Sequence, residues 1–486
     1  MDRCMARIAV TLLLSACGPS VEVAGLGDVC GSDRVRVLPL EDGDVMSGSP
    51  VRVGERLYFT VGEPAAPGEP ADVFSLFGPG IVNARVMSSG LCGESPRMIA
   101  QEVVSARENE RWPGAVVANT VTGDAIVVLD PDGVQPPRVL MPLSRDQLGA
   151  FAFNDDGHFS IVADPPDGPI GRLMLQRYPV AVTDPVPEPI ELLDDVRVDG
   201  GVAANESEVL VVRSDHELVR LDLVDGATQA LQPDVVAMWL SEDASWIAYT
   251  TDTNPDAPAE VLPLRLLNRS TGTSTDVGEV ATGPFAAIWR DSDLVFELPP
   301  GSEYGSRIVR LPSMTTIDVP AGLTIIRPIS SDRYLVNVDG GVATYDPATG
   351  AVVRLLEPGW SSFAAEDHVE SIAVDVDLDG SHLRDTGVWE RAYLDTGERE
   401  LIAHRASIIS RHLADDRAIT VVDIDESLVG DLVLIDPDSL AERRIDDHVL
   451  MTGIGVDSQT TPLGEGVIAY GVRDGSRSGV WLARPD

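Results

Sequence analysis

Lysine is absent from this chain of 486 residues, so all 36 basic side chains are arginines. The absence excludes chemistry that needs a lysine amine, such as Schiff-base formation or phosphate binding by a P-loop lysine. Acidic side chains number 78, which gives a formal net charge of −42. Proteins that bind nucleic acid without sequence preference need a basic surface, so we expect no nucleic-acid partner.

Aromatic residues make up only 5% of the chain, and the local motifs of common enzyme classes are missing. There is no GxSxG nucleophile elbow, no GxGxxG after a strand, no HExxH and no CxxC. The seven histidines lack the spacing of metal ligands, and we interpret them as turn or edge residues. A hydrophobic content of 44% is still enough for a sizeable folded core.

The first residues have the pattern of a targeting segment. Arg3 and Arg7 supply positive charge, and the apolar run Ile8–Leu14 is too short to span a bilayer. A Leu-Ser-Ala-Cys sequence follows and ends at Cys17. This arrangement resembles the signal peptide of bacterial lipoproteins, which is cleaved just before a cysteine that carries lipid.

The resemblance implies a signal peptide over residues 1–16 and a lipidated Cys17 at the start of a tether over residues 17–33. It also implies a protein of the cell envelope whose contact with the membrane is made through the lipid alone. Gly18 favours the outer membrane, on the periplasmic side or on the surface. The alternative is an ordinary secretory signal that happens to end at a cysteine. No later stretch reaches about 18 uncharged apolar residues, the length that would suggest a membrane span.

Two of the four cysteines, Cys30 and Cys92, lie beyond the leader and Cys17. An oxidising compartment favours a disulfide between them, which would tie the N-terminal segment to the first repeat. The alternative is a pair of buried free thiols.

From residue 34 to 486 the sequence is typical of an all-β protein. Runs of four to eight Val, Ile, Leu, Tyr and Thr residues alternate with turn signals, and no long stretch keeps a helical period without Gly or Pro. Many strands end in Asp and are followed by a turn rich in Asp and Gly, as in 126–133 (IVVLDPDG) and 342–350 (VATYDPATG). Asp caps such a turn, and Gly accepts a positive φ.

These strands recur in similar units of about 46 residues, a period typical of β-propellers with four strands per blade. We count ten units, from turns between the first and second strands near residues 54, 112, 156, 206, 243, 291, 332, 367, 415 and 465. The units resemble the TolB-like and WD-type repeats of propellers. We therefore predict one large propeller of eight to ten blades. Two smaller rings or an array of two-sheet sandwiches are the alternatives.

The two ends of the repeat region predict how the ring closes. The last unit has only two clear strands after its turn, Val467–Val472 and Gly479–Arg484, while Arg34–Leu40 is a strand without a unit of its own. An open array would leave unpaired strand edges and an unburied end face. We therefore expect Arg34–Leu40 to become the outer strand of the last blade.

One motif has the chemistry of a cation site. Asp375, Asp377 and Asp379 alternate ahead of a Gly turn, and Ser381 follows. Such oxygen clusters suit Ca²⁺, and the motif resembles the first half of a calcium loop. It departs from that pattern at Thr386, where a bidentate glutamate is usual. The alternative is a strand with acidic residues on its solvent face.

Adjacent carboxylates, including Asp446-Asp447, could suggest acid–base chemistry, but we interpret them as solvated turn residues. The favoured function is a non-catalytic propeller that binds a protein or another ligand in the cell envelope. The acidic surface suits a basic partner. The alternatives are a propeller enzyme, such as a lyase, hydrolase or quinoprotein with its site at the central channel, and a surface or adhesive protein stabilised by Ca²⁺.

Overall fold

Strands dominate the structure, as the sequence pattern predicts. The computed structural model describes Cys30 and residues 34–484, except 42, 66–70, 73–80, 110, 124, 143–150, 154–156, 164–167, 199, 253–258, 282–286, 291, 300, 331, 359, 366, 374–385, 408–409, 414–416 and 457–466. In the described part, no helix is long and apolar enough to cross a membrane.

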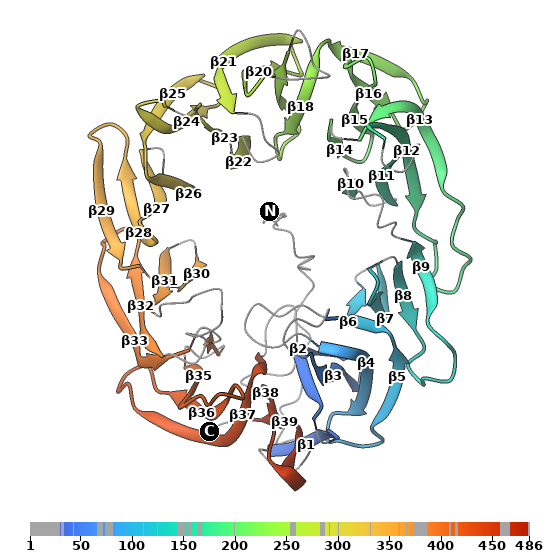
Figure 1. Ribbon diagram of the computed structural model, residues 1–486, viewed down its shortest axis with the longest axis vertical. Coiled ribbons are helices and arrows are strands. Elements are labelled where there is room, and N and C mark those ends of the chain that lie inside the picture. The colour runs from blue at the N-terminus through green and yellow to red at the C-terminus, as the bar shows by residue number, and fades with distance from the viewer. Residues whose placement is uncertain are drawn as a thin grey trace.

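The strands of the described residues form nine sheets that stand side by side in a ring (Figure 1). Eight of the sheets have four antiparallel strands each, and the ninth has seven. Within each four-stranded sheet the first strand lies nearest the middle of the ring, and the fourth strand lies at its outer rim (Figure 1). This is a β-propeller, in which each four-stranded unit is a blade.

The first eight blades follow one another along the chain, each with strands in sequential order. Blades 1 to 3 contain β2 (Val45–Val53), β3 (Arg56–Pro64), β4 (Ile81–Gly90), β5 (Arg97–Gln101); β6 (Val103–Asn109), β7 (Trp112–Thr120), β8 (Ala125–Leu129), β9 (Arg138–Pro142); and β10 (Phe151–Phe153), β11 (Gly157–Ala163), β12 (Ile170–Arg177), β13 (Ile190–Arg197). Blades 4 to 6 contain β14 (Val202–Ala204), β15 (Glu208–Val212), β16 (Leu218–Asp222), β17 (Thr228–Gln232); β18 (Val235–Leu240), β19 (Trp246–Thr251), β20 (Val261–Asn268), β21 (Thr273–Ala281); and β22 (Ala287–Arg290), β23 (Asp293–Glu297), β24 (Tyr304–Arg310), β25 (Thr315–Pro320). Blades 7 and 8 contain β26 (Leu323–Ser330), β27 (Arg333–Val338), β28 (Gly341–Asp346), β29 (Ala351–Leu356); and β30 (Trp360–Ala364), β31 (His368–Ile372), β32 (Gly387–Tyr393), β33 (Arg399–Ala406).

The seven-stranded sheet consists of two blades that share one long strand. Its members are β34 (Arg411–His412), β35 (Ala418–Val422), β36 (Val429–Ile435), β37 (Glu442–Val456), β38 (Ile468–Val472), β39 (Gly479–Ala483) and β1 (Arg34–Pro39), with a 3₁₀ turn, η2 (Gly475–Arg477), between β38 and β39. The first part of β37 pairs with β36 and completes blade 9, whereas its last residues pair with β38 and begin blade 10. The ring therefore has ten blades, which confirms the ten units counted in the sequence.

The strand that blades 9 and 10 share bends where one blade passes into the next. At other links between blades, Glu102 (φ 57°) and Asp234 (φ 57°) stand between the fourth strand of one blade and the first strand of the next. His448 (φ 56°) makes the corresponding bend inside β37. The left-handed conformation turns the chain sharply within one residue, so the hydrogen-bonded ladder continues almost without a break.

The closing strand lies where the sequence predicts it. β1 pairs antiparallel with β39, from Arg34 opposite Ala483 to Pro39 opposite Gly479. It is the fourth strand of blade 10, so the two ends of the repeat region complete a single blade (Figure 1). The predicted turn positions that the structure describes also hold, since 54, 206, 243, 332 and 367 lie between the first two strands of a blade and 112 begins the second strand of blade 2. Positions 156, 291, 415 and 465 lie outside the described residues.

Antiparallel pairing gives the ring two different faces. Because neighbouring strands run in opposite directions, successive connections lie at alternate ends of a blade. One face carries the connections between first and second strands and between third and fourth strands, and we call it the turn face. The other carries the connections between second and third strands and the links between blades, and we call it the link face.

The core lies between neighbouring blades, where the two sheet faces pack together. Strands in the middle of a blade are therefore buried on both sides, and every residue of β15, β35 and β38 is buried. The joint that closes the ring is built in the same way. Met46 and Leu57 of blade 1 pack in one apolar cluster with Leu38, Val480 and Leu482 of blade 10.

Candidate functional site at the ring closure

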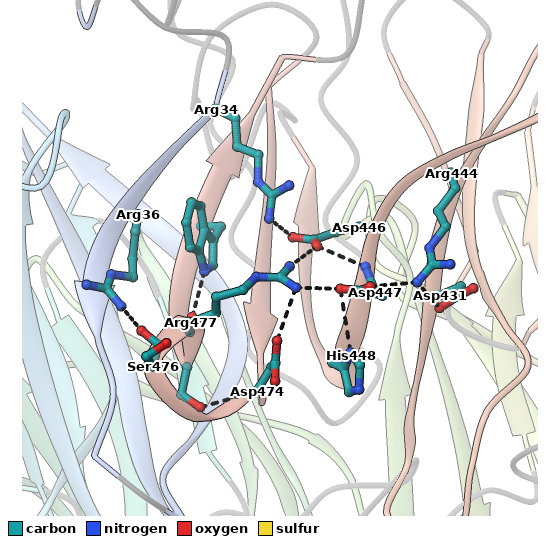
Figure 2. Close-up of polar contacts among 12 residues, drawn as sticks. Arg34, Arg36, Asp431, Arg444, Asp446, Asp447, His448, Asp474, Ser476 and Arg477 are labelled. Atoms are coloured by element: carbon teal, nitrogen blue, oxygen red, sulfur yellow. Dashed lines mark hydrogen bonds and ion pairs between the residues drawn. The ribbon is translucent and has the colours of Figure 1, made fainter.

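A group of charged side chains lies where blade 9 meets blade 10 (Figure 2). We call it the closure cluster, and its members come from four places: Asp431 on β36, four residues on β37, the connection that contains η2, and the first residue of β1. The closure cluster consists of Arg34, Asp431, Arg444, Asp446, Asp447, His448, Asp474 and Arg477.

Asp446 is the buried centre of the closure cluster, with only 2% of its side chain exposed. Arg34 donates a hydrogen bond to Oδ2, and Arg477 donates one to Oδ1. The Arg34 guanidinium also lies over the Trp481 ring, 4.6 Å from its centroid. A buried carboxylate is stable only when it is paired, and both partners of Asp446 belong to blade 10. Asp446 therefore bonds blade 9 to the strand that closes the ring.

Asp447 forms the more exposed half of the closure cluster. Its Oδ1 lies 2.6 Å from Nη1 of Arg477, and its Oδ2 lies 2.8 Å from Nη2 of Arg444. The hydrogen bond from Arg477 is the main reason why the pKa of Asp447 falls to about 2. Hydrogen bonds to Asp447 and the charge of Asp446 raise the pKa of Arg477 above its ordinary value. Both groups are therefore charged at neutral pH.

Part of the closure cluster has the donor set of a metal site. Asp447, His448 and Asp474 each offer a ligand atom, and these atoms lie within 4.8 Å of one another. However, Nη1 of Arg477 already lies 2.6 Å from Asp447 and 3.1 Å from Asp474. A divalent cation would have to displace this guanidinium. The carboxylates are neutralised by arginine, so the residues present fit an ion-pair network better than a metal centre.

A second buried carboxylate, Glu370 on β31, connects blade 8 to blade 9. Its side chain is 2% exposed and accepts hydrogen bonds from Nε1 of Trp389 at 3.0 Å and Nε of Arg391 at 2.8 Å. Nε2 of His412, on the first strand of blade 9, lies 2.9 Å from Oε2. Burial alone would raise the pKa of Glu370, but the bonds from His412 and Arg391 outweigh it, and the pKa is lowered.

Glu370 fixes the ring of His412 as well as the joint. The His412 ring packs against Trp389 with 4.6 Å between ring centroids, and Nη2 of Arg391 lies 3.5 Å from its Nε2. A carboxylate on one ring nitrogen selects the orientation of a histidine. Both carboxylate oxygens of Glu370 are bonded, to Trp389 and Arg391 of blade 8 and to His412 of blade 9, so Glu370 joins these two blades.

The structure corrects the interpretation of Asp446-Asp447 as solvated turn residues. Both lie in strand β37, and Asp446 is buried. His216 and His412 lie at the kinds of position expected from the sequence, a connection and an edge strand, although His216 is only 4% exposed and His412 takes part in a joint between blades. A signal was present for Glu370, because it is the one acidic residue inside an otherwise uncharged run, 369–373 (VESIA).

Cys30 and Cys92 are joined by a disulfide, with their Cα atoms 5.4 Å apart. Cys92 lies in the connection between β4 and β5 of blade 1, whereas Cys30 precedes β1 of blade 10. The bond therefore links the closing strand to the blade on the other side of the joint. Cys17, with its predicted lipid, lies outside the described residues.

The predicted calcium motif, Asp375, Asp377, Asp379 and Ser381, also lies outside the described residues. The flanking strands place its ends. β31 ends at Ile372 and β32 begins at Gly387, and these two strand ends lie at the link face of blade 8.

No protein-family model matches this chain, and no curated protein matches it. Solved structures with a similar fold include a tricorn protease, which is 12% identical over 82% of this chain and 43% of its own, with a TM-score of 0.32. An oligogalacturonate lyase in complex with manganese is 12% identical over 79% of this chain and 96% of its own, with a TM-score of 0.29. TolB from Acinetobacter baumannii is 13% identical over 60% of this chain and 77% of its own, with a TM-score of 0.26.

These similarities concern the fold alone. The chain spans less than half the length of the tricorn protease that it matches. At such identities and TM-scores, the activity of a matched protein says nothing about the activity of this one.

Proposed function

We propose that this chain is a lipid-anchored protein of the bacterial cell envelope, held in the outer membrane through Cys17. In this proposal its propeller binds another protein and catalyses no reaction. The anchor rests on the sequence around Cys17. The disulfide between Cys30 and Cys92 supports it, because such bonds persist in oxidising compartments outside the cytoplasm.

The observation that carries the binding role is the part played by Asp446 and Glu370, two of the five buried carboxylates among the described residues. Asp446 and Glu370 are each surrounded by donors, and each bonds one blade to the next. Their charge therefore serves the stability of the ring. A rigid ring presents its connections on two faces as surfaces for another protein. The formal net charge of −42 favours a partner with a basic surface.

The anchor is tested by expressing the full chain and a Cys17→Ser variant in a bacterium with two membranes. We expect the unchanged chain in the outer-membrane fraction, with an N-terminal peptide whose mass includes acyl chains. The Cys17→Ser variant should lose both the lipid and the membrane association. An unchanged chain that is cleaved elsewhere and carries no lipid would contradict the anchor.

Binding is tested by cross-linking in intact cells. The matched variant is Leu38→Asp, which puts a charge into the closing joint, where Leu38 is 1% exposed. We expect the unchanged chain to form a defined cross-linked product that added salt weakens, because exposed charge pairs are screened. The variant should lose this product. Identical products from both chains would contradict a role for the closed ring.

A further inference from the structure

The disulfide fixes the face from which the N-terminal segment leaves the propeller. Cys92 lies in the connection between the third and fourth strands of blade 1, which belongs to the turn face. Arg34, the first residue of β1, lies opposite Ala483 at the end of β39, which is the same face. The chain that precedes Cys30 therefore starts from the turn face, beside blade 1.

The most exposed large apolar side chains lie on that face too. Among the described residues, the three with at least three quarters of their surface exposed are Val134 (75%), Val180 (90%) and Val224 (88%). They belong to the connections between third and fourth strands in blades 2, 3 and 4. Single exposed valines are ordinary on a protein surface. These three occur in successive blades, on one face, directly after blade 1.

Contacts between blades make this part of the turn face continuous. Arg97, at the start of β5 in blade 1, forms an ion pair of 3.0 Å with Asp132 in the connection of blade 2. Arg138, at the start of β9 in blade 2, donates a hydrogen bond of 2.8 Å to the carbonyl oxygen of Asp184 in the connection of blade 3. The site of the disulfide and the connections that carry Val134 and Val180 therefore belong to one surface.

The number of residues between Cys17 and Cys30 limits how far this surface can lie from a membrane anchor. Thirteen residues extend at most about 45 Å. A lipid on Cys17 would therefore keep the turn face of blade 1 close to the bilayer. The disulfide fixes the end of the tether at Cys30, so the residues between Cys30 and Arg34 cannot add to its length.

We propose that the turn face of blades 1 to 4 lies against the lipid bilayer, with Val134, Val180 and Val224 at the level of the headgroups. The inference rests on the proposed anchor at Cys17. Acidic neighbours such as Asp132 keep the contact shallow and favour zwitterionic over anionic lipid. The link face, at which β31 ends and β32 begins, is then turned away from the membrane and toward a partner.

The test compares two introduced thiols in the same blade. Val224→Cys lies on the turn face and Asp215→Cys on the link face of blade 4, and both positions are exposed. Each introduced thiol is the one available for labelling, because Cys30 and Cys92 are bonded to each other and Cys17 would carry the lipid. Each full-length lipidated chain is labelled with a fluorophore and bound to phosphatidylcholine vesicles that contain a nitroxide quencher at the headgroup.

We expect the fluorophore at position 224 to be quenched at least threefold more strongly than the one at position 215. Equal quenching, or stronger quenching at position 215, in chains that float with the vesicles would overturn the proposed orientation and leave the anchor standing. Chains that fail to float would overturn the anchor and the orientation together. Replacing phosphatidylcholine with phosphatidylglycerol should reduce quenching at position 224, and an increase would contradict the shallow acidic contact.

Discussion

At the scale of single residues, buried and exposed charged side chains have different effects on the stability of this protein. Among the described residues, many acidic side chains are exposed, whereas Asp446 and Glu370 are 2% exposed and are bonded to a neighbouring blade. A buried charge that loses its partner is strongly destabilising, whereas an exposed ion pair contributes little. The two carboxylates should therefore matter far more to stability than their neighbours in the sequence.

We expect Asp446→Asn to lower the free energy of unfolding by roughly 2–3 kcal/mol, because charge-assisted bonds to Arg34 and Arg477 are lost from a buried position. Asp447→Asn is the matched control, since Asp447 has the same arginine partner but is 34% exposed. Asp447→Asn should lower the free energy of unfolding by less than half as much. Urea denaturation of both variants measures the difference, and equal losses would contradict the special role of burial.

The low pKa of Asp447 predicts how the stability of the folded chain changes at acidic pH. Its pKa is about 2 in the folded chain, below the ordinary value of 3.8. A lowered folded pKa gives stability that is complete above pH 4 and is lost as the pH falls from about 4 to 2. We expect the melting temperature of the unchanged chain to fall more steeply over this interval than that of Asp447→Asn. Parallel curves would show that Asp447 contributes nothing to acid unfolding.

Sequence reasoning could not find these residues as a group. Asp446-Asp447 looks like a turn pair, because its strand continues into a bend at His448 that no glycine or proline announces. The arginines that bond Asp446 lie at positions 34 and 477, and only the ring closure brings them together. Glu370 and His412 belong to different repeats, so their contact depends on the packing of whole blades.

At the scale of elements, the closing strand is held in two independent ways. β1 has its backbone ladder with β39 in blade 10, and the disulfide ties the residues before it to blade 1. The disulfide partner Cys92 lies in a connection between strands, so connections as well as strands stabilise the closed ring.

Reduction of the disulfide should loosen the closing strand. The bond joins residues 62 positions apart, and a disulfide typically contributes about 2–4 kcal/mol of stabilisation. We expect a reducing agent to lower the free energy of unfolding by this amount in the unchanged chain. Cys92→Ser should start at the lower value and not respond to the reducing agent. A variant that responds as strongly as the unchanged chain would point to another target of reduction.

The motif between β31 and β32 gives a prediction about Ca²⁺. If Asp375, Asp377 and Asp379 bind the ion, Ca²⁺ should raise the melting temperature of the unchanged chain by a few degrees, because ligands that bind the folded state stabilise it. Asp377→Asn should remove the rise and leave the melting temperature in chelator unchanged. If Asp377→Asn lowers the melting temperature equally with Ca²⁺ and with chelator, these carboxylates are solvated side chains of a strand and do not bind the ion.

At the scale of the whole molecule, the repeat pattern determined most of what could be predicted. Turns near residues 54, 206 and 332 recur because each blade needs the same reversal, so ten weak signals together gave a count of ten units and a prediction of eight to ten blades. The incomplete last unit and the extra strand at Arg34 predicted the closure. The shared strand β37 was not predictable, because a left-handed histidine has no sequence signature. The orientation proposed for the ring toward a membrane rests on the disulfide and the topology together with the proposed anchor.

The place of the closing strand also determines the order of events during biosynthesis. β1 is the first strand to be made, yet its partner β39 lies at the other end of the chain. At 5–20 residues per second, roughly 20–90 s pass before Ala483 has been synthesised. Throughout that time the apolar residues Val37 and Leu38 have no β39 to cover them. We therefore expect the nascent chain to need a chaperone for its N-terminal part until synthesis is complete.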